Sequence, residues 1–294
     1  MPIDVLEQHP FLNYRNDFIP PSQVKYKSLI VGSFPIYAIT NSLDETFNVI
    51  AERFDIDQTK VRFFYGSKKS DFWKLVAEAH LENDPTETPA PIDYNLRKQN
   101  CIDFLERNKI LITDSVYRTN RENECSEDTN LWIEANNFAS QNCQTNENIL
   151  QLLENHPTID SLFFTSTMID AHSPYGWFCQ SINGELNEQA NWQVNGGRSW
   201  FSEITIQERI YNAFLLPTPK TRGIHFTDDQ RLPMFVNYLQ SYVPQFYAEV
   251  QNVLVVNRTQ AQKNRLTELR YSFLVECYRQ ALIHRNRNFN GTMP

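Results

Sequence analysis

The fold is decided by Ser28-Leu29-Ile30-Val31-Gly32-Ser33-Phe34-Pro35, an apolar run that ends abruptly in Gly-Ser-Phe-Pro. A continuous apolar run of this length, bounded by turn residues, predicts a strand that is buried on both faces of a sheet. Residues 209–217 form a second such run, and Pro-Thr-Pro-Lys-Thr-Arg follows at 217–222. In open α/β sheets, sites form in the loops that follow the carboxyl ends of strands. We therefore expect the loops after these two runs to border a site.

Two more apolar runs, 109–116 and 161–165, predict further strands, and segments with helical spacing separate the four. This alternation predicts an α/β fold with a parallel sheet that is covered on both faces. The polar residues 118–148 are expected to form a long excursion with a short helix. Asn195-Gly196 predicts a tight hairpin within 192–201. Helices are expected at 42–54, 72–81, 95–108, 149–155, 171–182, 229–243 and 246–284, the last with a break near 257–259.

Two units are expected along the chain. Residues 1–245 form the α/β domain, with residues 1–27 as an extended arm packed on its core. Residues 246–294 form a helical extension that packs on the core or binds a partner. The apolar stripe of this extension could support a dimer, but we favour packing within the chain and expect a monomer.

The composition sets limits on function. The chain has 294 residues, of which 41% are hydrophobic and 13% aromatic, enough for a sizeable core. Its net charge of −8 argues against a non-specific nucleic-acid coat protein, which binds mainly by neutralising phosphates. Without an apolar run of about 18 residues or a signal-peptide pattern, no membrane partner and a cytoplasmic location are expected. The 5 cysteines are widely spaced, so neither a disulfide framework nor a metal site is expected.

An aromatic cluster follows the first loop. It consists of Phe63-Phe64-Tyr65-Gly66 and Asp71-Phe72-Trp73-Lys74. Aromatic side chains beside a binding loop can stack on a planar base, and Tyr65 and Phe72 are the candidates for this role. The alternative is that each of these rings belongs to the hydrophobic core.

Together these motifs resemble the uracil-DNA glycosylase superfamily. The resemblance covers scattered motifs, and it is closest to the hypoxanthine- and mismatch-type branches that have a Gly-Ser-x-Pro loop. It implies a three-layer α/β/α sandwich with a central four-stranded parallel sheet. It also implies hydrolysis of the N-glycosidic bond of a base flipped out of DNA, without a cofactor. The candidate residues in the first loop are Gly32, Ser33, Phe34 and Pro35.

The chain departs from the family pattern at three positions. Phe34 stands where the family often has a water-activating Asp or Asn. Ser70 stands where the hypoxanthine-type branch has an Asn two residues before a Phe-Trp pair, and Asp71 follows it. Leu216 stands where some branches have a His. Asp71 could orient water instead, or it could simply cap the helix that begins at Phe72.

Asp114 is the strongest single candidate. It follows the apolar run Ile110-Leu111-Ile112, and it matches the position at which the classical uracil enzymes read the base edge with an Asn. An ionised Asp only accepts hydrogen bonds, so it could accept N3–H of uracil or N1–H of hypoxanthine. It could instead be the base that activates water, or cap the following turn.

The second loop supplies the expected phosphate contacts. Leu216-Pro217-Thr218-Pro219 resembles the superfamily segment that inserts near the lesion and grips phosphate. Thr218 could donate a hydrogen bond to a phosphate, Lys220 and Arg222 could neutralise one, and His225 could stabilise the departing base.

The resemblance therefore implies a DNA glycosylase that removes a deaminated or modified base, of the uracil or hypoxanthine type. Asp114, Asp71 and Ser70 are its candidate catalytic positions. The alternative is a catalytically degenerate nucleic-acid or nucleotide binder on the same fold. A third reading is an unrelated α/β protein that shares these loops by chance.

Overall fold

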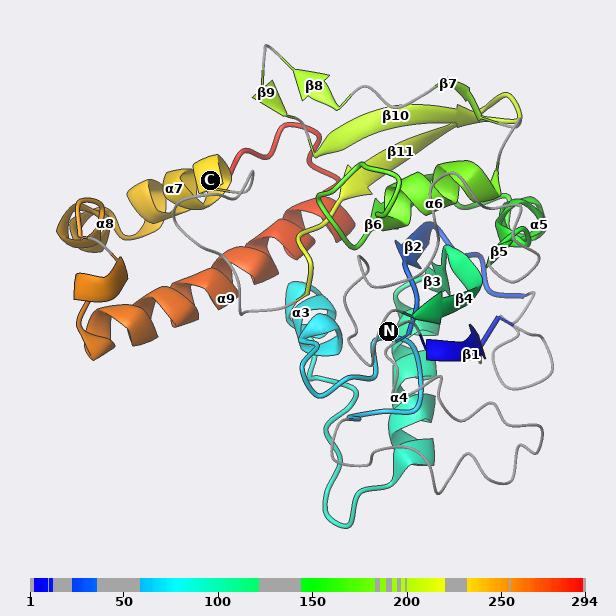
Figure 1. The fold of residues 1–294 in the computed structure, drawn as a ribbon, viewed down its shortest axis with the longest axis horizontal. Coiled ribbons are helices and arrows are strands. Elements are labelled where there is room, and N and C mark those ends of the chain that lie inside the picture. The colour runs from blue at the N-terminus through cyan, green and yellow to red at the C-terminus, as the bar shows by residue number, and fades with distance from the viewer. Residues whose placement is uncertain are drawn as a thin grey trace.

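The computed structural model describes residues 3–9, 11–12, 23–35, 59–121, 144–182, 186–188, 192–194, 197–198, 200–219, 232–253 and 255–292. The fold is α/β with a mostly parallel central sheet (Figure 1). This confirms the predicted class. Six strands are ordered β3-β2-β6-β11-β10-β7. Their bounds are β2 Ser28–Gly32, β3 Ile110–Asp114, β6 Ser161–Phe164, β7 Leu186–Glu188, β10 Phe201–Ile206 and β11 Arg209–Leu215.

The four predicted strands are the parallel part of this sheet. β2 pairs in parallel with β3 and β6, and β6 pairs in parallel with β11. The prediction of four strands was incomplete, because β10 and β7 extend the sheet with antiparallel pairing. The carboxyl ends of β3, β2, β6 and β11 therefore lie along one edge.

Alternate residues of the central strand face two different cores. Ile30 belongs to one hydrophobic cluster, while Leu29 and Val31 belong to the other. All three side chains are fully buried. Complete burial of such a side chain stabilises the fold by about 1.5–3 kcal/mol, so the continuous apolar run is explained by cover on both faces.

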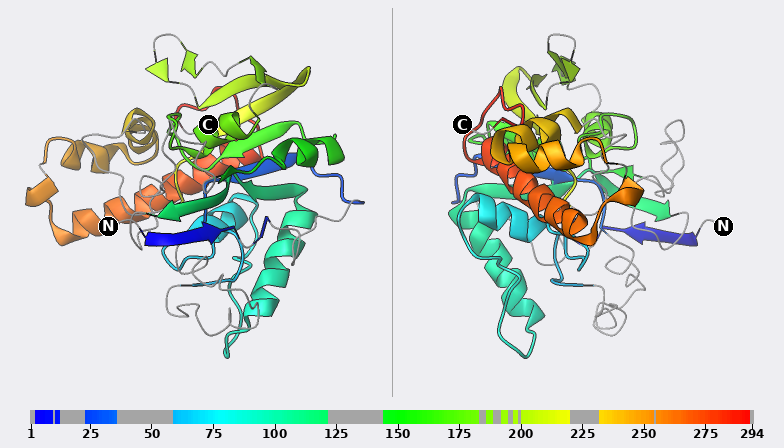
Figure 2. Two further views of the ribbon diagram at one scale, coloured as in Figure 1. Left: turned by 45° about the vertical axis from the view of Figure 1, so that its right-hand side comes forward. Right: turned by 90° about the vertical axis from the view of Figure 1, so that its left-hand side faces the viewer.

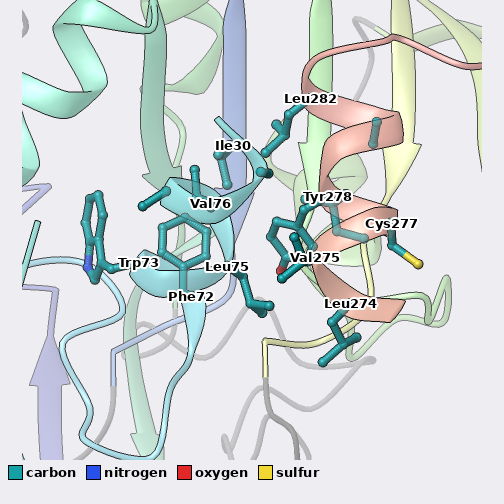
Figure 3. Close-up of a cluster of buried hydrophobic side chains, with 14 of the residues drawn as sticks. Ile30, Phe72, Trp73, Leu75, Val76, Leu274, Val275, Cys277, Tyr278 and Leu282 are labelled. Carbon is teal, nitrogen blue, oxygen red and sulfur yellow. The ribbon is translucent and has the colours of Figure 1, made fainter. Parts of the chain in front are cut away.

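Helices cover both faces of the sheet. α3 (Phe72–Ala79), α4 (Tyr94–Arg107) and α9 (Gln260–Leu282) contribute side chains to the cluster of Ile30. α5 (Ile149–Asn155) and α6 (Pro174–Ser181) contribute to the cluster of Leu29 and Val31. Figure 3 shows α3 and α9 facing each other, with Phe72 and Val76 on one helix and Tyr278 on the other.

The C-terminal region is helical, as predicted. α7 (Leu232–Tyr242), α8 (Pro244–Val250) and the short 3₁₀ helix η3 (Val255–Asn257) precede α9. α9 begins at a capping box, in which the Thr259 hydroxyl accepts from the Gln262 N–H at 3.2 Å and the Gln262 side chain accepts from the Thr259 N–H at 3.0 Å. Figure 2 shows α7 and α9 side by side, with α8 beyond the end of α7.

A second sheet lies beside the carboxyl end of β3. β4 (Val116–Arg121) follows β3 after Ser115 and pairs with β1 (Ile3–Gln8) and β5 (Gln144–Thr145). The expectation of an excursion from residue 118 was therefore wrong at both ends, because β4 and β5 are strands. The arm contains a paired strand, β1. Antiparallel pairing of β8 (Gln193–Val194) with β9 (Gly197–Arg198) confirms the predicted hairpin, and its turn residues 195–196 lie outside the described residues.

Two further sequence predictions concern membranes and one helix. Among the described residues, every helix is too short or too polar to cross a membrane. The predicted helix 42–54 lies outside the described residues.

Candidate functional site

The strand order creates a topological switch point between β2 and β6. The chain passes from β2 to β3 on one side and later returns to β6 on the other side of β2. At such a point, the loops that follow the two strands diverge and leave a crevice outside their carboxyl ends. Here these loops begin at Gly32 and Thr165, and Thr165 N–H donates to the Val31 carbonyl at 3.2 Å.

Asp114 lies at this edge, as the sequence predicted. It ends β3 directly beside Gly32 in the parallel register, and only 5% of the residue is exposed. Its Oδ1 lies against the Cα of Gly32, so closely that a Cβ at this position would overlap it. The Ser115 N–H and hydroxyl both donate to the Gly32 carbonyl, at 2.9 Å and 3.0 Å. The carboxylate is therefore fixed at the start of the first loop.

His9 is a site residue that the sequence analysis missed. Its Nε2 lies 2.8 Å from Oδ2 of Asp114, and its side chain is fully buried. The pairing of β1 with β4 delivers it, and its backbone N–H donates to the Tyr117 carbonyl at 2.8 Å. The two partners are 105 residues apart in the chain, and a lone His in an arm carries no local signal of this contact.

Tyr65 brings a second polar group to Gly32. Its hydroxyl lies beside the Gly32 Cα, next to Oδ1 of Asp114, and 2.8 Å from the Thr165 hydroxyl. Its ring stacks on Phe72 with centroids 3.9 Å apart and an interplanar angle of 17°. Tyr65 has a φ of 54°, an unfavourable backbone conformation for an aromatic residue. Strain of this kind persists where surrounding contacts hold it, and it is common at functional sites.

The structure distinguishes the two candidates for base stacking. Tyr65 is half-buried, whereas Phe72 is fully buried and packs in the core between α3 and α9. Phe72 therefore supports the Tyr65 ring, and of these two residues only Tyr65 is partly exposed. Trp73 strengthens the cluster, because its indole N–H donates to the Phe64 carbonyl at 2.8 Å.

The second loop and the start of α3 are joined. The Asp71 N–H donates to the Pro219 carbonyl at 2.9 Å. Asp71 stands at the N-cap position of α3, but its side chain makes no capping hydrogen bond, so the capping alternative is not what the structure contains. The Ser70 hydroxyl instead accepts from the Phe72 N–H at 3.3 Å. The backbone of Asp71 therefore joins the start of α3 to the 217–219 loop, and its carboxylate does not cap the helix.

Tyr278 of α9 anchors the same loop from below. Its hydroxyl donates to the Pro217 carbonyl at 3.0 Å. Burial, helped by Cys277, raises the pKa of the Tyr278 phenol well above its ordinary value, so the donor proton is retained. Thr218 is half-buried between Pro217 and Pro219, which are both buried. Through Tyr278, the C-terminal helix takes part in shaping the edge of the sheet.

The first loop is held from the side of β4. The Val116 N–H donates to the Ser33 carbonyl at 3.0 Å, and Pro35 is buried. Phe34 is half-buried, and its ring meets His9 edge-on at 5.7 Å between centroids. Phe34 thus helps to enclose His9.

Asn146 is a further residue that the sequence analysis did not single out. Its amide donates to the Thr113 hydroxyl at 3.1 Å and to the Asp114 carbonyl at 3.0 Å. Its backbone N–H donates to Ser115. It therefore stiffens the strand end that carries Asp114. The remaining predicted contacts, Lys220, Arg222 and His225, lie outside the described residues.

Two wider searches add little to this geometry. Within the described part of the chain, no group of three or more His, Cys, Asp or Glu side chains is placed to hold a metal ion. Comparison with protein-family models, with curated protein sequences and with solved structures found no match.

Proposed function

We propose that this chain is a DNA base-excision glycosylase, which hydrolyses the N-glycosidic bond of a deaminated or otherwise modified base. The proposal takes the fold as the three-layer α/β/α arrangement of the uracil-DNA glycosylase superfamily, with β3, β2, β6 and β11 as its four parallel strands. Helical cover on both faces supports this reading. So do the positions of the Gly32 and Pro217 loops, which follow the first and last of these strands.

One observation carries the proposal: the Asp114 carboxylate and the Tyr65 hydroxyl converge on the Cα of Gly32 at the switch point. Because glycine lacks a side chain, both polar groups fit directly against the backbone there, where a Cβ would overlap them. A carboxylate only accepts hydrogen bonds. Uracil and hypoxanthine present a ring N–H where cytosine and adenine present an acceptor nitrogen. An acceptor-only group at this place therefore favours uracil over cytosine and hypoxanthine over adenine.

The proposed reaction uses the second carboxylate for water. The bond between the anomeric carbon and the base nitrogen breaks, and its electron pair leaves with the base. The oxygen of water then bonds to the anomeric carbon as the water gives a proton to Asp71. The transition state resembles an oxocarbenium ion, and a carboxylate stabilises its positive charge. Asp114 reads the base, and Tyr65 offers it a stacking face.

A second candidate function is a nucleic-acid or nucleotide binder on the same fold. Phe34 supports it, because this ring takes a position where the family often has a water-activating side chain. Leu216 supports it as well, since it is buried and apolar where some branches have a His. A binder would keep base reading by Asp114 and lose the chemistry at Asp71.

Labelled oligonucleotides that contain uracil, hypoxanthine, xanthine or only normal bases test the proposal. After incubation with the chain, alkali cleaves the strand at any abasic site. We expect cleavage at uracil or hypoxanthine, and loss of cleavage without loss of binding in Asp71→Asn. Selective binding without cleavage by the unaltered chain would instead establish the binder. If the unaltered chain neither binds nor cleaves any of these oligonucleotides, both functions are refuted.

A further inference from the structure

His9 is a fully buried imidazole that takes no part in the proposed reaction. Rings surround it: the centroids of Phe11, Phe34 and Phe64 lie 5.8, 5.7 and 5.3 Å from its own. Both of its ring nitrogens have polar partners within this apolar surround. A buried polar group that is fully hydrogen-bonded in this way has one defined orientation.

The hydrogen-bond partners of the His9 ring determine which of its nitrogens carries the hydrogen. The Phe11 backbone N–H donates to Nδ1 of His9 at 3.1 Å, so Nδ1 is an acceptor and carries no hydrogen. The ring hydrogen is therefore on Nε2, which lies 2.8 Å from Oδ2 of Asp114 and donates to it. A backbone N–H cannot change its role, so it selects this tautomer.

The tautomer has a consequence for Asp114. Because Nε2–H holds Oδ2, the carboxylate cannot rotate freely, and Oδ1 is directed to the Cα of Gly32 beside the Tyr65 hydroxyl. A donated hydrogen bond also keeps Oδ2 in the role of an acceptor. The carboxyl group is thus held in one orientation at the point where a base edge would be read.

The geometry points to His9 as a positioning residue that fixes the base specificity of this site. It orients Asp114 so that Oδ1 accepts a ring N–H of the base. In uracil and hypoxanthine this N–H lies next to the carbonyl that deamination produces. Cytosine and adenine bind less well, because their ring nitrogen at this position is an acceptor and would face the acceptor Oδ1. This inference rests on the proposed function, and it adds that the arm of residues 3–9 completes the site.

Two substitutions of His9 give a matched test. The amide nitrogen of Gln reaches about as far as Nε2 of His, whereas that of Asn reaches only as far as Nδ1. We expect His9→Gln to keep base release within about 3-fold of the unaltered chain, and His9→Asn to lower it about 10- to 100-fold. His9→Asn should also reduce the preference for uracil over cytosine in oligonucleotide binding. Urea unfolding of both variants shows whether each is folded.

The tautomer itself can be measured without activity. ¹⁵N-histidine spectra of the full chain report which ring nitrogen carries hydrogen, and His9→Gln identifies the His9 signals. We expect hydrogen on Nε2 only, and a change in that signal in Asp114→Asn. Hydrogen on Nδ1 in the unaltered chain, or a His9 signal that is unchanged in Asp114→Asn, would overturn the inference.

The two arms separate this inference from the proposed function. A chain that releases no base, but whose His9 carries hydrogen on Nε2 and responds to Asp114→Asn, would refute the glycosylase and leave the positioning of the carboxylate standing. A chain that releases base equally well in His9→Asn would keep the glycosylase and overturn the role of His9.

Discussion

Substitution of Gly32 by alanine tests the site through its tightest contact. The backbone at Gly32 is open to any residue, so the only obstacle to a Cβ is what it would meet. It would overlap Oδ1 of Asp114 and the hydroxyl oxygen of Tyr65, and each would have to retreat by about 1 Å to reach van der Waals separation. Neither moves freely, because His9 holds Asp114 at 2.8 Å and Thr165 holds Tyr65 at 2.8 Å.

The magnitudes follow from this overlap. Overpacking of a buried site typically costs about 1–3 kcal/mol, and we expect a loss of unfolding free energy in that range for Gly32→Ala. A displacement of about 1 Å at a reacting group can lower a rate about 100-fold, and base release should fall by that order. Urea unfolding and single-turnover base release measure the two effects.

Ile30→Val is the matched control for Gly32→Ala. Ile30 is fully buried two residues earlier in β2 and faces the α3 side of the sheet. Its truncation should cost about 0.5–1.5 kcal/mol and leave base release unchanged. If Gly32→Ala releases base at the rate of Ile30→Val, the placement of Asp114 and Tyr65 in the site is wrong.

Three further substitutions test the supports of the fold. Tyr278→Phe leaves the buried Pro217 carbonyl without its donor, and urea unfolding should register a loss of about 1–3 kcal/mol; an unchanged midpoint would contradict the anchoring of the loop. Thr259→Ala removes the cap of α9 and should cost about 1 kcal/mol by the same measurement, whereas Thr259→Ser should cost less. Burial lowers the pKa of His80 in the folded chain. As the pH falls, the unfolded chain therefore binds a proton at His80 before the folded chain does, and the free energy of unfolding decreases below about pH 6.5. His80→Gln should weaken this fall between pH 7.5 and 5.5, and an identical fall would show that His80 does not contribute.

The parts of the fold that could be predicted are those with a strong local pattern. The four parallel strands are continuous apolar runs, and such runs are readily recognised as buried strands: β2, β3, β6 and β11. β10 was missed because Gln207 and Glu208 form the turn before β11 with φ values of 47° and 67°. Turns of this kind are usually marked by Asn, Asp or Gly, so the sequence carried no hairpin signal.

The candidate site shows the same division. Asp114 could be predicted, because a carboxylate at the end of a buried strand is costly unless it is paired or used. Its partner His9 could not be predicted, because only the pairing of β1 with β4 brings His9 to Asp114. Nothing local in residues 3–9 specifies that pairing. Tyr65 was identified within an aromatic group, but only the structure separates its half-buried ring from the buried ring of Phe72.

We propose that the Asp114 carboxylate accepts the ring N–H of the base that is released. The most direct measurement is single-turnover release of free uracil and hypoxanthine from oligonucleotides, detected as the free base, by the unaltered chain, Asp114→Asn and Asp103→Asn. Asp103 is an exposed carboxylate on α4, so its substitution makes the same chemical change away from the site. The account predicts release by the unaltered chain and by Asp103→Asn, and at least about a 100-fold loss in Asp114→Asn. Equal release by all three chains would contradict it.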